Sequence, residues 1–152
     1  MAADVQLVIF KLENEDYGLP ISKVQEINRM VTVTRLPQTP DFMEGIINLR
    51  GRVIPVVDLR KRFGFEAKEY QETTRIMVVD ISGQTVGLIV DAVNEVVKIA
   101  GESIELPPPA FVMDAKFVQG IGKLENRLVI LLDINRILTS QESVMVKEAA
   151  TV

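Results

Sequence analysis

The sequence has 152 residues, enough for one compact domain or two very small ones. It contains no cysteine and no histidine, which excludes disulfides, thiolate metal sites, cysteine nucleophiles and the most common general base. The net charge of −4 gives the chain no overall attraction to nucleic acid or to anionic membranes. No apolar run approaches the roughly 20 residues that a membrane-spanning helix needs, so we expect a cytoplasmic location.

Short runs rich in β-branched residues recur along the chain. Such side chains suit a pleated, half-buried surface, and many short runs are typical of an all-β barrel or sandwich. Turn-like residues at 82–84 and 125–126 separate two pairs of runs, which predicts tight hairpins. The expected strands are residues 5–12, 45–49, 53–57, 75–81, 85–90, 93–99, 117–124 and 127–132.

Helical signals are few. Residues 22–25 and 40–43 are each expected to form one turn, and residues 139–149 are the best candidate for a longer helix. Thr139 and Glu142 have the spacing of a capping box at its start. Residues 106–114 contain three consecutive prolines and are expected to form a stiff, extended loop.

An internal repeat relates the two halves of the chain. Residues 45–64 read GIINLRGRVIPVVDLRKRFG and residues 120–139 read GIGKLENRLVILLDINRILT, which align without a gap at an offset of 75 residues. The alternative is chance similarity between two hairpins, but the glycine, the turn and the aspartate all agree in register. We interpret the repeat as two similar β subdomains. We expect the recurring Asp58 and Asp133 to cap short helical turns.

No constellation of catalytic residues is present in the sequence. There is no Gly-x-Ser-x-Gly elbow, no phosphate-binding glycine loop and no histidine to activate a hydroxyl group. The carboxylates Glu13, Glu15 and Asp16 do not have the spacing of a calcium loop, and we expect them to lie in a solvated turn. An enzyme is therefore the least expected class of protein.

Basic residues concentrate between residues 50 and 62. We expect Arg60, Lys61 and Arg62 to form a solvated charged rim. For Arg50 we favour either docking to a partner's carboxylate or an internal brace, because the guanidinium group makes fixed bidentate contacts. Nucleic-acid binding is less favoured, since the whole chain is acidic.

Residues 21–30 show an imperfect alternation of charged and apolar side chains. Val24, Ile27 and Met30 recur at three-residue spacing. The segment is expected to be an edge strand that either packs on the core or offers an apolar docking strip.

Several segments together resemble the CheW family of chemotaxis coupling proteins. The most specific is EGIINLRG at 44–51, which continues as VIPVVDLR at 53–60. Weaker matches follow in the family's order. They are YGLPI at 17–21, KVQEI at 23–27, VGLIVD at 86–91 and GIG at 120–122.

The resemblance implies a fold. It implies an all-β chain with two intertwined five-stranded SH3-like β-barrel subdomains, short helices and a C-terminal helix. We expect one subdomain around residues 16–64 with a C-terminal contribution, a second around 73–138, and a helix or tail at 139–152.

The resemblance also implies a non-catalytic scaffold with no cofactor and no metal. CheW-like proteins join the cytoplasmic tips of transmembrane chemoreceptors to the regulatory domain of the chemotaxis histidine kinase. The absence of histidine distinguishes this chain from that kinase. The implied location is the cytoplasm, with recruitment to receptor arrays at the inner face of the membrane. Neither nucleic acid nor direct membrane contact is implied. A nucleic-acid-binding or small-ligand-binding barrel stays open as the alternative.

Site residues follow from the resemblance only position by position. Val24, Glu26, Arg50 and Val96 fall where the family forms a receptor-binding groove between the barrels. Ile27 and Arg29 fall where the first barrel meets the kinase. Phe111 matches an aromatic residue of a second, ring-forming contact with the kinase.

Overall fold

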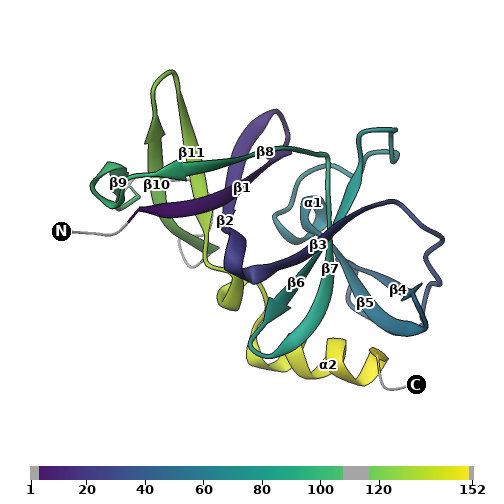
Figure 1. The fold of residues 1–152 in the computed structure, drawn as a ribbon. Coiled ribbons are helices and arrows are strands. Elements are labelled where there is room, and N and C mark those ends of the chain that lie inside the picture. Colours follow the sequence, from purple (N-terminus) through teal and green to yellow (C-terminus); the bar gives the residue numbers. More distant parts are fainter. Residues whose placement is uncertain (1–3, 108–116, 151–152) are drawn as a thin grey trace.

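The computed structural model describes residues 4–107 and 117–150, which form two mixed β-sheets side by side (Figure 1). The five-stranded sheet has the order β3-β6-β7-β5-β4, and we call it the first barrel. The six-stranded sheet has the order β8-β1-β2-β11-β10-β9, and we call it the second barrel. The strands are β1 Val5–Leu12, β2 Glu15–Pro20, β3 Val24–Arg29, β4 Met43–Leu49, β5 Arg52–Asp58, β6 Arg75–Ile81, β7 Gln84–Val90, β8 Ala92–Ile99, β9 Ile104–Glu105, β10 Val118–Leu124 and β11 Arg127–Leu132.

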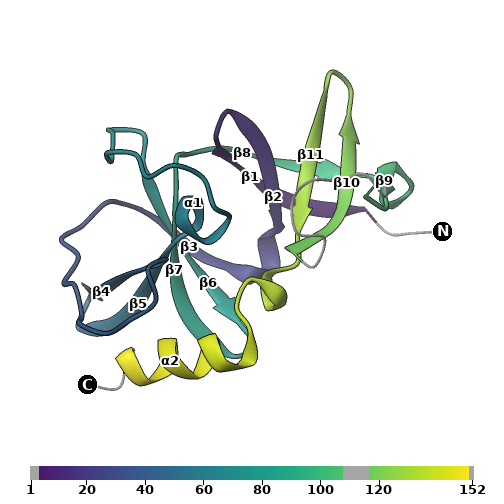
Figure 2. The same cartoon turned by 180° about the vertical axis from the view of Figure 1, so that it is seen from behind.

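Each barrel combines a hairpin from one half of the chain with strands from the other half. The hairpin β1–β2 joins β8, β9, β10 and β11, whereas the hairpin β6–β7 joins β3, β4 and β5. The exchange is sealed by two parallel pairings, β5 with β7 and β11 with β2. Figure 2 shows from behind how the chain crosses between the barrels. This topology is the intertwined pair of SH3-like subdomains that the resemblance implied.

The exchange changes the expected subdomain boundaries. Residues 75–90 were expected with the second subdomain, but β6 and β7 pair with β3 and β5 of the first barrel. Residues 5–20 belong to the second barrel. The local sequence of a hairpin does not indicate which distant strand it pairs with, so the exchange of hairpins between the barrels was not predicted.

The internal repeat is confirmed at the level of strand register. In both copies the hairpin carries a bulge at the same position, between Met43 and Gly45 in β4 and between Val118 and Gly120 in β10. Both aspartates cap the following turn as expected: Asp58 Oδ1 accepts from the Arg60 N–H at 2.9 Å, and Asp133 Oδ1 from the Asn135 N–H at 3.2 Å.

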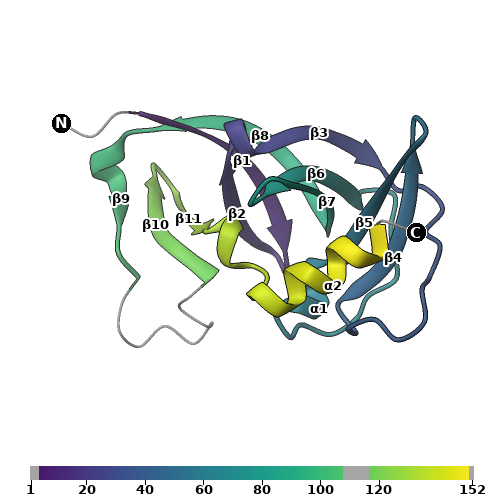
Figure 3. The ribbon, with the colours of Figure 1, turned by 90° about the horizontal axis from the view of Figure 1, so that it is seen from below.

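Of the helices in the described residues, two follow the hairpin of a copy of the repeat, two follow β2 and β8, and the longest lies at the C-terminal end. They are η1 Ile21–Lys23, α1 Leu59–Arg62, η2 Gly101–Ser103, η4 Ile134–Arg136 and α2 Ser140–Ala150. The capping box is confirmed, since the Thr139 N–H donates to Glu142 Oε1 and the Glu142 N–H donates to Thr139 Oγ1. Figure 3 shows α2 lying across the first barrel, where it packs against β4 and β5.

Candidate partner-binding surfaces

β3 is an edge strand of the first barrel with two different faces. Val24, Glu26 and Asn28 are partly buried, whereas Ile27 and Arg29 alternate with them and are exposed. A bulge separates Val24 from Glu26 in the pairing with β6. Beyond the bulge, the expected groove residue Glu26 lies on one face of the strand, and the expected kinase-contact residues Ile27 and Arg29 lie on the other. Val24 lies before the bulge and does not share the face of Glu26, because it pairs with Val79 whereas Glu26 pairs with Val78.

The tip of the β4–β5 hairpin reaches the first of these faces. Arg50 and Gly51 both have positive φ, 50° and 82°, which matches the twist of a two-residue hairpin turn. The Gly51 N–H donates to Asn48 Oδ1 at 2.9 Å and fixes the turn. From this tip Arg50 Nη2 forms an ion pair with Glu26 Oε2. This ion pair joins the tip of the β4–β5 hairpin to β3, so it connects the two edges of the five-stranded sheet.

The Glu26 carboxylate also accepts a hydrogen bond from Asn28 Nδ2 at 2.5 Å. Asn28 and then Arg50 hold the pKa of Glu26 below its ordinary value. The Arg50 side chain is 72% exposed. Arg50 is therefore a surface cation rather than an interior brace, and its partner Glu26 stays ionised.

Val96 lies on β8, the edge strand of the second barrel, and is 51% exposed. Its neighbour Glu95 forms an ion pair with Arg127 of β11. Within the described part of the chain, no hydrogen bond or ion pair joins Val96 to Glu26 or Arg50. The structure thus brings Glu26 and Arg50 together and leaves Val96 on the neighbouring barrel. Phe111 lies outside the described residues.

The expected solvated rim at Arg60–Arg62 is wrong. The Arg60 side chain is only 7% exposed, and its guanidinium group bonds to Glu13 and to Asp91 Oδ2, the latter at 2.7 Å. Arg62 donates to the Ile137 carbonyl at 2.6 Å and to Glu142 at 3.0 Å. Both arginines are bonded to other groups of the protein, so the basic cluster does not offer a nucleic-acid surface.

Arg62 also lies between two aromatic rings that occupy equivalent places in the repeat. Its guanidinium carbon is 5.1 Å from the Phe42 ring centroid and 4.9 Å from that of Phe117. A cation between two rings is attracted electrostatically by both. Arg62 therefore fastens the two copies of the repeat to each other.

The expected solvated turn at Glu13–Asp16 is confirmed for the exposed residues 13–15 but wrong for Asp16. Glu13 bonds to buried Arg60, and Asp16 is itself buried, with ion pairs to Lys11 at 2.9 Å and Arg127 at 3.4 Å. Local spacing does not predict this burial, because one of the two cationic partners of Asp16, Arg127, lies 111 residues away.

A second buried carboxylate lies beneath the loop between α1 and β6. Glu44 is paired with Lys61 at 2.6 Å and accepts from the Tyr70 hydroxyl group at 2.9 Å. Burial opposes its ionisation, but these two partners hold the pKa of Glu44 below its ordinary value. Burial, together with the negative charge of Glu44, raises the pKa of the nearby Asp58.

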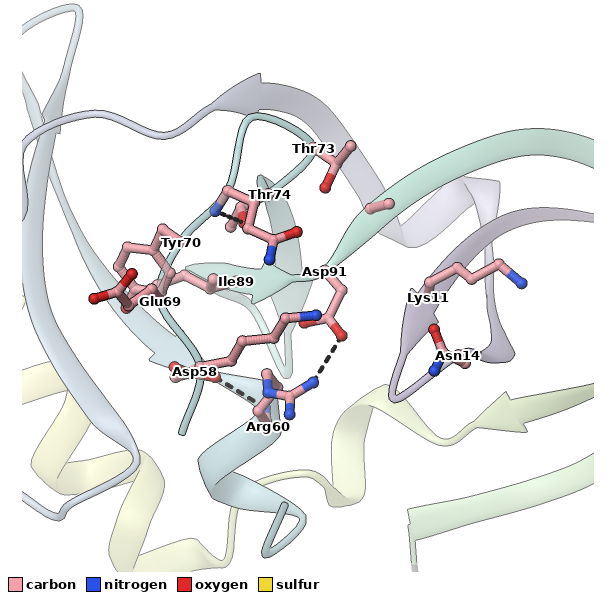
Figure 4. A pocket seen from close by; sticks show the side chains of 13 residues that line it. Lys11, Asn14, Asp58, Arg60, Glu69, Tyr70, Thr73, Thr74, Ile89 and Asp91 are labelled. Carbon is pink, nitrogen blue, oxygen red and sulfur yellow. Dashed lines mark hydrogen bonds and ion pairs between the residues drawn. The ribbon is translucent and has the colours of Figure 1, made fainter. Parts of the chain in front are cut away.

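A polar cavity of about 170 Å³ lies beside Arg60 (Figure 4). Its walls carry Lys11 and Lys68 as well as Asp58 and Asp91, and Arg60 and Asp91 are bonded to each other. The charges of both signs compensate one another, so the cavity gives no support to the small-ligand alternative. Across the described residues, no group of three or more acidic side chains is placed to hold a metal ion. No helix in that part of the chain has the length and apolar character to cross a bilayer.

Comparison with known proteins agrees with this architecture. A family model of the CheW-like domain matches residues 6–142. The chain belongs to the CheW-like family. It is 40% identical to the chemotaxis protein CheW of Klebsiella aerogenes over 95% of this chain and 88% of that protein. It is 33% identical to CheW of Bacillus subtilis over 91% of this chain and 89% of that protein.

A solved structure shares the fold. The scaffolding protein TtCheW from Thermoanaerobacter tengcongensis matches with a TM-score of 0.85 and 44% sequence identity, covering 93% of this chain and 96% of that one. These relationships confirm that the chain is a non-catalytic scaffold of chemotaxis signalling, as the resemblance implied.

Proposed function

We propose that the chain couples chemoreceptors to the chemotaxis histidine kinase by binding both at once. Membership of a family of chemotaxis scaffolds supports this role. The observation that carries it is the two-faced edge strand β3. One face is bordered by the Glu26–Arg50 ion pair, and the other exposes Ile27 and Arg29. Two surfaces on opposite faces of one strand allow two partners to bind without overlap.

The receptor surface in this proposal combines Val24, Glu26 and Arg50 of the first barrel with Val96 of the second. Val96 offers an exposed apolar contact, and Arg50 offers a cation that can exchange Glu26 for a receptor carboxylate. A helical hairpin with one apolar stripe and acidic flanks matches this chemistry. The partner is the cytoplasmic tip of a methyl-accepting chemoreceptor, which would recruit the chain to receptor arrays at the inner face of the membrane.

The kinase surface in this proposal is the outward face of β3 with Ile27 and Arg29. Ile27 is 41% exposed and offers an apolar contact on this face. An edge strand also has one row of unpaired backbone groups that a partner strand can use. The regulatory domain of the kinase, with Phe111 as a further contact residue, is the partner that fits this reading.

The test is isothermal titration of the full chain against a receptor cytoplasmic hairpin and, separately, against the kinase regulatory domain. We expect binding to each and, by size-exclusion chromatography with light scattering, a complex of all three components. Competition between the two partners would contradict separate surfaces. Binding to neither would remove the coupling role.

A further inference from the structure

Two of the polar contacts between the barrels occupy equivalent places in the repeat, and we call them junctions. At one junction, Arg60 of α1 reaches from the first barrel to Glu13, in the turn of the second barrel's β1–β2 hairpin. At the other, Asn135 of η4 reaches from the second barrel to the turn of the β6–β7 hairpin, where its Oδ1 accepts from the Ser82 N–H at 3.2 Å. The first junction is charged and buried on the Arg60 side, whereas the second is neutral and exposed.

Arg60 makes three side-chain contacts at its junction. Nε donates to the Glu66 carbonyl at 3.0 Å, Nη1 to Asp91 Oδ2 at 2.7 Å, and Nη2 to Glu13 Oε1. The Glu13 N–H also donates to Asp91 Oδ2, at 3.1 Å. A planar guanidinium group with fixed donor directions can hold three acceptors in one geometry, whereas an ammonium group on a flexible stem cannot.

The acceptors of Arg60 lie next to the start of β8, the strand that carries Val96. Asp91 immediately precedes β8, and its N–H donates to the Lys11 carbonyl of β1 at 3.0 Å. β1 is also the strand that pairs with β8. Arg60 thus ties the start of β8 and the end of its partner strand to α1 of the first barrel. Three residues after Asp91, β8 reaches its exposed stretch, which begins at Asn94 and includes Val96.

We infer that Arg60 is a positioning residue that sets the angle between the two barrels, and thereby the width of the receptor groove between β3 and β8. This inference rests on the proposed function, because the groove needs residues of both barrels. The kinase-contact residues Ile27 and Arg29 both lie on β3 of the first barrel, so their relative geometry does not depend on that angle. Arg60 itself touches neither partner.

The test compares Arg60→Lys and Glu13→Gln with Asn135→Ala, the matched control at the equivalent junction. Glu13 is 45% exposed, so its variant keeps the test open if Arg60→Lys fails to fold. Each protein is titrated with the receptor hairpin and with the kinase regulatory domain. Because the chain has no cysteine, Val53→Cys and Leu128→Cys place one spin label on each barrel at exposed positions, for distance measurement by pulsed electron paramagnetic resonance.

We expect both junction variants to broaden the distance distribution and to weaken receptor binding by about fivefold or more, the usual scale of coupling between sites. Kinase binding should stay within about twofold of wild type. Asn135→Ala should change neither measurement. An unchanged distance distribution, or a parallel fall in both affinities, would overturn the inference. If the wild-type chain fails to bind the receptor hairpin, the proposed function fails. If the wild-type chain binds it and the junction variants behave like wild type, this inference fails and the proposed function stands.

Discussion

The edge strands of the two barrels share one design but use it differently. In each, a bulge precedes a glutamate that pairs with an arginine of the β4–β5 or β10–β11 hairpin, and an exposed apolar residue follows. In β3 these residues are Glu26, Arg50 and Ile27; in β8 they are Glu95, Arg127 and Val96.

The two edge strands differ in whether the arginine has a second ion-pair partner. Arg127 also pairs with the buried Asp16 at 3.4 Å, so it neutralises an interior charge and is committed to the fold. Arg50 stands at a turn tip with Glu26 as its only ion-pair partner among the described residues. The hairpin arginine therefore supports stability in the second barrel, whereas Arg50 of the first barrel, which is not the repeat counterpart of Arg127, remains an exposed cation available for binding.

The largest expected difference between the two barrels is the loss of stability when the glycine at each bulge is replaced by alanine. Gly45 has φ +146°, and a Cβ there would lie 2.0 Å from the Thr34 carbonyl oxygen. At Gly120 the nearest atoms are Ile104 Cγ2 at 2.9 Å and the Glu105 carbonyl oxygen at 3.0 Å, and the backbone is not in the positive-φ region. We expect Gly45→Ala to lower the free energy of unfolding by more than about 3 kcal/mol and Gly120→Ala by about 1–2 kcal/mol. Urea denaturation followed by circular dichroism measures both, and equal losses would show that the two bulges are equally strained.

A smaller difference in the free energy of unfolding is expected between variants of the two hairpin arginines, Arg127 and Arg50. Arg127→Ala removes one of the two cations that pair with buried Asp16, and we expect it to lower the free energy of unfolding by about 1–2 kcal/mol. Arg50→Ala breaks an exposed pair and should change that free energy by less than about 0.5 kcal/mol. The same denaturation assay tests this. A large loss in Arg50→Ala, with altered circular dichroism, would make Arg50 a structural brace instead.

The smallest expected effect is on the pH dependence of stability. The bulge residue is the buried Glu44 in the first barrel and the exposed Gln119 in the second. Because the pKa of Glu44 is lower in the folded protein than in the unfolded chain, its contribution to stability is complete above the unfolded pKa. That contribution is lost as the pH falls through the folded pKa. Glu44→Gln should therefore reduce the loss of stability between pH 7 and about pH 4. Urea midpoints at several pH values measure this, with Gln119→Glu as the control, which should not deepen the loss.

Much of the fold could be predicted from the sequence because it is encoded locally. The turn residues, the capping aspartates Asp58 and Asp133 and the Thr139 capping box each act within a few residues. The repeat then implied that two such local designs coexist. β2 was missed, because it begins with Glu15 and Asp16 and contains Gly18, a composition typical of a turn.

The features that were not predicted depend on distant partners. Arg60 looks like a surface cation until Glu13 and Asp91, which lie 47 and 31 residues away, are brought beside it. The exchange of hairpins between barrels has the same origin, because the strands that receive a hairpin lie in the other half of the chain. Among the site residues, the ion pair of Glu26 and Arg50 joins positions 24 residues apart, which spacing alone does not indicate.

The central claim is that two separate surfaces bind two partners. It is tested most directly by isothermal titration of the variants Arg50→Glu and Ile27→Glu, each against the receptor hairpin and against the kinase regulatory domain. The account predicts that Arg50→Glu weakens receptor binding and spares kinase binding, that Ile27→Glu does the reverse, and that both variants stay folded. Loss of both interactions in either folded variant would contradict it.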